Sequence, residues 1–198
     1  MFSTLLSDAS PDTLPDTSPN TLPDTSPELK KHVIDIYNAF TNLRKWSTCN
    51  EIKEAFEALN AQIASLTTNV TIADEKIKEA FKALKKLVNL TSNYISKLID
   101  LCDEVRDQIV TIKDSSSTQS CTYSHANDMH ILINNIHSSL WKTTIPLHKI
   151  PKQITTDKEM TVAITEAKAY YDMTSETLSV LDVNIIKIFM ILDELKKI

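Results

Sequence analysis

Glycine is missing altogether from this chain of 198 residues, although average usage of about 7% would supply about 14. Glycine is the residue that most readily takes positive φ, so every connection in the chain is built without it. Tight hairpins and β-rich folds are disfavoured for this reason. The same absence removes the glycine-rich loops with which nucleotide-binding folds approach phosphate groups. The composition therefore argues against a nucleotide-dependent enzyme.

Cysteine and long apolar runs are also scarce. Cys49, Cys102 and Cys121 are too few and too scattered for a disulfide scaffold or a zinc ribbon, which favours a reducing compartment. No run of about 18 apolar residues offers a transmembrane helix. The opening letters, MFSTLLSDAS, lack the basic start and the apolar length of a secretory signal. We therefore expect a cytoplasmic protein with no transmembrane segment.

Negative charge is concentrated at the N-terminal end. The net charge is −5, and the aspartates of residues 1–27 supply four of those charges. The rest of the chain is nearly neutral, and its basic residues are interleaved with acidic ones. A nucleic-acid binder normally gathers its lysines and arginines on one face. We therefore expect no nucleic-acid partner.

An octad repeat follows the first residues, reading SPDTLPDT, SPNTLPDT and SPELKKHV from Ser10 onward. Its prolines disfavour helix, and it has almost no large apolar groups whose burial would offset the entropy of ordering. Residues 1–26 are therefore predicted to be a disordered, acidic, proline-rich arm. The simplest role for such an arm is a spacer.

Serine precedes proline three times in the arm, at Ser10, Ser18 and Ser26. This is the context of proline-directed phosphorylation, so these serines are candidate modification sites at which phosphate would add negative charge. Ser26, Pro27 and Glu28 also have the order of an N-cap, a first helical position and an acidic first turn. A helix is therefore expected to begin there.

Apolar residues then recur at helical spacing over most of residues 27–198. The first helix is predicted over about 28–46, and Thr48-x-x-Glu51 is a capping box for the next one. From Ile52 an apolar stripe keeps one phase to Ile112, interrupted only by two polar residues. We favour one continuous helix over 51–112 with coiled-coil-like packing. The β-branched stretch at 67–74 is the doubtful place, and a break there would give an antiparallel hairpin.

The pentapeptide IKEAF occurs twice, 25 residues apart. That spacing is close to seven helical turns, so both copies would extend one face of a continuous helix. Two more helices are predicted, over 124–144 and over 157–197, the latter started by a Thr156-x-x-Glu159 capping box. Their summed length matches a continuous 51–112 helix. We therefore predict an all-α, elongated antiparallel helical bundle with long coiled-coil-like helices.

Few side chains suggest chemistry. Cys121, His125 and Asp128 share a face if the third helix begins early, with His130 and His137 nearby. The established H-E-x-x-H and C-x-x-C spacings are absent. We therefore predict no catalytic residue, no metal site and no cofactor.

Two segments favour an interaction role. The connection WKTTIPLHKIPK combines an aromatic residue, lysines and prolines, and it serves either as a stiff linker or as a contact for an acidic partner or an anionic membrane. Its candidate contact residues are Trp141, Lys142, His148, Lys149 and Lys152. The segment 180–192 is apolar on more than one face, as in a deeply buried helix or an oligomer seam.

These patterns predict a non-enzymatic helical interaction or scaffold protein. It would bind protein partners or self-associate through amphipathic helix faces. The alternative is a membrane-surface or lipid-binding bundle whose amphipathic helices open onto an interface.

Overall fold

The computed structural model describes residues 27–68 and 75–197. Within those ranges every regular element is helical, so the predicted all-α class is confirmed. The elements are α1 Pro27–Ser47, α2 Asn50–Thr67, α3 Glu75–Ser115, α4 Cys121–Thr143, the short 3-10 helix η1 Pro146–Lys149, and α5 Asp157–Leu195. The predicted arm, with Ser10, Ser18 and Ser26, lies outside the described residues.

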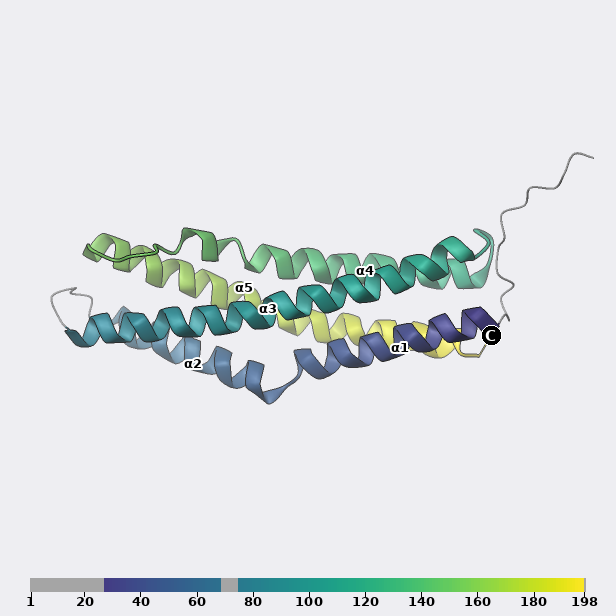
Figure 1. The fold of residues 1–198 in the computed structure, drawn as a ribbon, viewed down its shortest axis with the longest axis horizontal. Coiled ribbons are helices and arrows are strands. Elements are labelled where there is room, and N and C mark those ends of the chain that lie inside the picture. The colour runs from purple at the N-terminus through teal and green to yellow at the C-terminus, as the bar shows by residue number, and fades with distance from the viewer. Residues whose placement is uncertain (1–26, 69–74, 198) are drawn as a thin grey trace, which may run out of the picture.

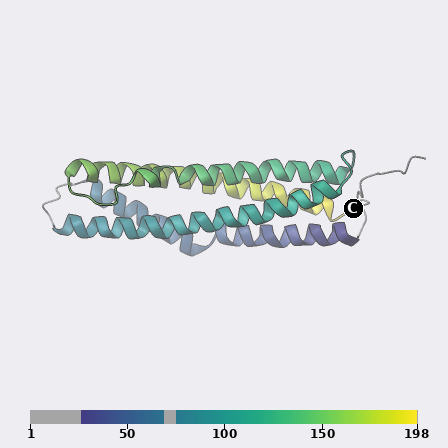
Figure 2. The same ribbon diagram turned by 45° about the horizontal axis from the view of Figure 1, so that its top comes forward.

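The helices lie side by side along one axis (Figure 1). α1 and α2 follow one another along one side, α3 runs back beside both, α4 returns beside α3, and α5 closes the arrangement next to α1, α2 and α4. Figure 2 shows the same order from a second direction. α1 and α2 together thus occupy one of the four helix positions of an up-and-down arrangement, and α3, α4 and α5 occupy the other three. The start of α1, the end of α3, the start of α4 and the end of α5 meet at one end.

The prediction of one continuous helix over 51–112 is wrong, because α2 and α3 are separate helices. They form the antiparallel hairpin that the sequence offers as the alternative. Gln62 Nε2 of α2 donates to the backbone oxygen of Ala80 on α3 at 2.9 Å. On one continuous helix, residues this far apart in sequence would be separated by about 27 Å. The side chains of Thr67 and Thr68 bond back to Ile63 and Ser65 where α2 ends. The two IKEAF copies therefore lie on different arms of the hairpin.

The start of α2 also differs from the prediction. Thr48 was expected to cap this helix, but its hydroxyl donates to the Arg44 oxygen of α1 at 2.8 Å. The N-cap is Cys49, in an extended conformation with φ −70° and ψ 143°, and its side chain makes no capping hydrogen bond. The junction between α1 and α2 thus has no side-chain cap.

The capping box predicted for the last helix is present. The Thr156 hydroxyl accepts from the Glu159 amide, and the Glu159 side chain accepts from the Thr156 amide. α5 therefore begins where the sequence indicates. The buried face of α5 packs against the buried faces of the other helices in one core. α5 contributes to this core Met160, Ala163, Ile164, Ala167, Tyr170, Leu181, Ile185, Ile188, Leu192 and Leu195.

Candidate interaction surface

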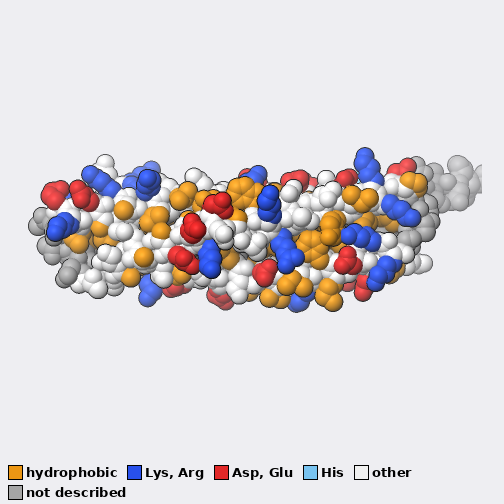
Figure 3. All heavy atoms as spheres, turned by 90° about the horizontal axis from the view of Figure 1, so that it is seen from below, with side chains coloured by type: hydrophobic (Ala, Val, Ile, Leu, Met, Phe, Trp, Pro, Cys, Tyr) orange, Lys and Arg blue, Asp and Glu red, His pale blue; other side chains and the backbone are white. Residues whose placement is uncertain are grey.

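α5 carries more apolar side chains than the core takes up. Besides its buried face, it exposes a set that we call the α5 outer stripe. Met190 is 64% exposed and Val183 is 53% exposed, whereas the buried apolar residues of α5 are at most 8% exposed. The stripe consists of Val180, Val183, Ile186 and Met190. A space-filling view from below shows apolar side chains interspersed with basic and acidic side chains along that face (Figure 3).

Opposite charges flank part of this stripe. Glu176, Val180, Val183 and Lys187 are spaced by four, three and four residues, so they share one side of α5. Both charged side chains are exposed. An acidic and a basic side chain therefore flank Val180 and Val183, and neither belongs to an ion pair among the described residues.

A shallow groove adjoins the stripe between α4 and α5. Its volume is about 220 Å³, and it is lined by Ser139, Lys142, Met173, Glu176, Thr177 and Val180. Lys142 is one of the contact residues that the sequence predicts. The groove thus connects the end of α4 with the Glu176 end of the stripe.

The other predicted contact residues lie on α4, on η1 and in the connection that follows η1. Trp141 is exposed, and its ring lies 6.5 Å from that of His137. Lys149 Nζ lies 3.9 Å from Glu166 Oε2 of α5. His148 is exposed on η1. The predicted set is therefore distributed between the last turn of α4 and the η1 connection.

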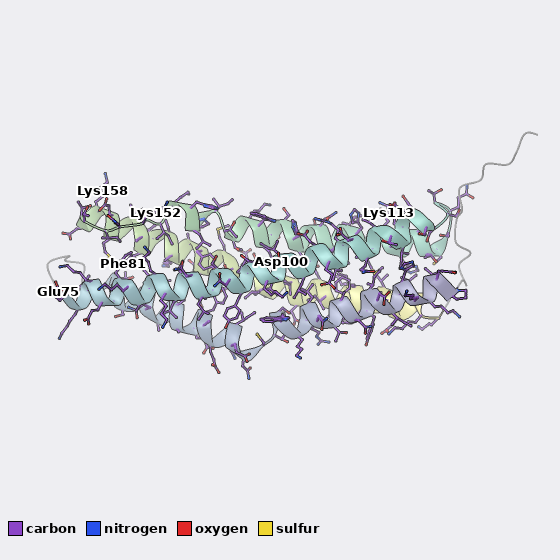
Figure 4. The ribbon with its side chains drawn as sticks, viewed as in Figure 1. Glu75, Phe81, Asp100, Lys113, Lys152 and Lys158 are labelled. Atoms are coloured by element: carbon purple, nitrogen blue, oxygen red, sulfur yellow. The ribbon has the colours of Figure 1, made fainter. Side chains whose placement is uncertain are left out.

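The connection after η1 is tied to α3. The backbone oxygen of Lys152 accepts from Lys85 Nζ at 2.7 Å, and both residues border a hollow of about 160 Å³. Figure 4 places Lys152 toward the same end as Glu75, while Lys113 lies toward the opposite end. These contacts are those expected of a stiff linker, one of the two roles that the sequence leaves open for this segment.

The histidine-rich region holds no group of metal ligands within the described residues. Cys121 and His125 do meet, because α4 begins early enough to include both, with Sγ and Nδ1 3.2 Å apart. The others face elsewhere: His137 Nε2 lies 3.2 Å from Asp103 Oδ1, and His130 Nε2 contacts Asn134. Burial, followed by nearby Lys113 and Arg106, lowers the pKa of His130.

Sequence reasoning missed the acidic partner of His125. Glu194 Oε2, on the last turn of α5, lies 3.0 Å from His125 Nε2. The two residues are 69 positions apart, and no local pattern links them. Only the fold brings the start of α4 against the end of α5.

Two further hollows of about 340 Å³ each flank the junction between α1 and α2. Cys49 borders both, Trp46 and Tyr94 line one, and Tyr171 and Leu178 line the other. No ion pair or hydrogen bond of the described residues links Cys49 to a titratable side chain in either hollow.

Comparison of the chain with protein-family models, with curated proteins and with solved structures gives no match. No helix in the described part of the chain is long and apolar enough to cross a membrane. The α5 outer stripe is the surface feature on which exposed apolar side chains lie closest together in sequence.

Proposed function

We propose that this protein is a non-enzymatic helical interaction protein: an elongated, coiled-coil-like antiparallel bundle that self-associates through the α5 outer stripe. The observation that carries the proposal is the exposure of Val180, Val183, Ile186 and Met190 on one side of a helix whose other side fills the core. Contiguous exposed apolar groups on a folded protein mark interaction sites.

A second copy of the chain suits this stripe. In a contact with two-fold symmetry, when a first residue of one copy meets a second residue of the other copy, that second residue of the first copy also meets the first residue of the other. With the two copies of α5 antiparallel and centred between Val180 and Val183, Glu176 of one copy faces Lys187 of the second copy. The charged side chains on both sides of Val180 and Val183 then each gain a partner of opposite charge. A parallel pairing would instead place like charges together, which is destabilising.

The test is size-exclusion chromatography with light scattering on the full chain. We expect the wild type to form a dimer at high concentration and Val183→Glu to remain monomeric, because the new carboxylate would be buried without a partner. Ile131→Glu is the matched control, since Ile131 is exposed to a similar degree on α4. It should dimerise like the wild type. A wild type that stays monomeric, or a Val183→Glu protein that still dimerises, would contradict the proposal.

The lipid-binding alternative is tested with the same proteins. Each is mixed with vesicles that contain an anionic phospholipid and then floated through a density gradient. An interaction protein should stay at the bottom and keep its helical content. A monomer that floats with the vesicles and gains helicity would replace self-association with membrane-surface binding.

A further inference from the structure

The three cysteines occupy three different environments. Cys102 is fully buried, and burial raises the pKa of its thiol to about 12, with nearby Asp103 adding to the effect. Cys49 is half-buried at the uncapped start of α2. Cys121 is exposed, and its sulfur lies 3.2 Å from His125 Nδ1. Cys121 is therefore the thiol that combines access with an adjacent proton acceptor.

The fold supports this pair from two elements. Cys121 is the first residue of α4, where the unpaired amides and the helix dipole favour negative charge. His125 lies one turn later on the same face, and its Nε2 is held by Glu194 Oε2 of α5 at 3.0 Å. Lys113 of α3 lies against the same first turn of α4, with Nζ 5.7 Å from the centre of the Tyr123 ring.

The contacts of the His125 ring fit a charged imidazolium. Nδ1 faces the Cys121 backbone oxygen at 2.9 Å as well as the sulfur, and Nε2 faces a carboxylate. All these partners accept hydrogen bonds, and only the doubly protonated ring can donate from both nitrogens. A thiolate at Cys121 would complete this set. Thiolate, imidazolium and carboxylate in sequence form the arrangement that activates nucleophilic cysteines.

We propose that Cys121 is a thiol–disulfide exchange site for small disulfides, activated by His125 and positioned through Glu194. The Cys121 thiolate attacks one sulfur of the disulfide, forming a new S–S bond as the original one breaks. The second sulfur leaves as a thiolate and takes its proton from the His125 imidazolium. The product is a mixed disulfide on Cys121 and one free small thiol. The disulfide itself is the oxidant, so no other reactant is needed.

The test follows the reaction of the folded full chain with the aromatic disulfide DTNB, whose released thiolate is coloured. We expect one fast-reacting thiol, absent from Cys121→Ser and retained in Cys49→Ser. Cys102 should react only after unfolding. His125→Asn should slow the fast phase at least about tenfold, and Glu194→Gln should slow it less.

A readout of activation separates this role from a structural one. Between about pH 6 and about pH 9, the wild-type rate should depend on pH less steeply than the His125→Asn rate, because the His125 ring beside the sulfur can take up the thiol proton. Circular dichroism melts verify that each variant is folded, and mass spectrometry after incubation with glutathione disulfide locates the adduct. Equal rates for Cys49 and Cys121, or an unchanged rate and pH profile in His125→Asn, would overturn the proposal.

Discussion

The hydroxyl of Tyr170 lies in the middle of the core, where its ring packs 6.0 Å from that of Phe56. Burial raises the pKa of Tyr170 to about 12, and the nearby hydroxyls of Thr91 and Thr174 lower it only in part. The Tyr170 and Thr174 oxygens meet no partner in good hydrogen-bond geometry, and the Thr91 hydroxyl donates to the Leu87 oxygen at 2.9 Å. This buried polar group is therefore poorly compensated.

Removing that hydroxyl should cost little. We expect Tyr170→Phe to leave the free energy of unfolding unchanged or raised, within about 1 kcal/mol, because a poorly bonded polar group leaves the core while the ring remains. Tyr170→Ala should lower it by about 3–5 kcal/mol through the cavity it creates. Urea denaturation measures both. A loss above about 2 kcal/mol in Tyr170→Phe would show that the hydroxyl is well bonded in solution.

The same region shows how far periodicity predicts individual residues. Counted in steps of three and four from Ile164 and Ala167, the apolar positions of α5 lead to Tyr171, but the structure buries Tyr170 completely and Tyr171 only in part. Neighbouring helical residues are about 100° apart, so both tyrosines lie near the edge of one face. Phe56 of α2 contacts both rings, with centroid distances of 6.0 Å and 6.4 Å, so the pattern of α5 alone does not decide which tyrosine is buried.

The N-terminus of α5 is an element whose stability should depend on pH. The Glu159 carboxylate accepts hydrogen bonds from the backbone and hydroxyl of Thr155 and from the Thr156 amide, and these lower its pKa. A lowered folded pKa contributes stability above the unfolded value of about 4.3, and that contribution is lost as pH falls through the folded pKa. Thermal melts should therefore show Glu159→Gln less stable than the wild type at about pH 6.

The difference in melting temperature between the wild type and Glu159→Gln should narrow toward about pH 3, where the wild-type carboxylate becomes protonated. Glu54→Gln is the control, because Glu54 is an exposed glutamate on α2, outside both the capping box and the α5 outer stripe. It should follow the wild type. A Glu159→Gln protein that tracks the wild type at every pH would show that the capping box contributes no measurable stability.

The uncapped junction of α1 and α2 offers a stabilising substitution. Cys49 has the extended backbone of an N-cap but no capping side chain. Cys49→Ser would supply a hydroxyl of similar size that accepts from the first turn, and we expect it to raise the free energy of unfolding by about 0.5–1 kcal/mol. Cys49→Ala should not raise the free energy of unfolding, because alanine has no side-chain oxygen that could accept from the first turn. Equal stability of the two variants in urea would show that the junction cannot place a cap.

The hairpin of α2 and α3 explains why the apolar pattern of the sequence favours one continuous helix over 51–112. Both arms bury their stripes in one core, so their apolar positions keep a heptad phase whether or not the chain turns between them. Phase alone cannot reveal a reversal of direction. The signals that could reveal the reversal are local and weak. One of them is the pair Thr67 and Thr68, whose hydroxyls donate to backbone oxygens of the preceding turn where α2 ends.

At the scale of the whole molecule, composition and periodicity predicted the helical class and most helix ends. They also indicated excess apolar surface between residues 180 and 192 without showing where it points. The structure divides it: Leu181, Ile185 and Ile188 are in the core, while Val183 and Met190 are outside. That division required the neighbours of α5, because both sides of a helix with two apolar faces look alike in sequence.

Self-association through that surface should make thermal stability depend on concentration. A standard interface buries about 1,600 Å², and a stripe of a few side chains with one groove supplies only part of this, so we expect a reversible dimer. Since dimerisation stabilises the folded state by mass action, the wild-type melting temperature should rise with protein concentration. Val183→Glu should remove the rise and Ile131→Glu should keep it. A melting temperature that is independent of concentration in all three proteins would exclude the dimer in the range measured.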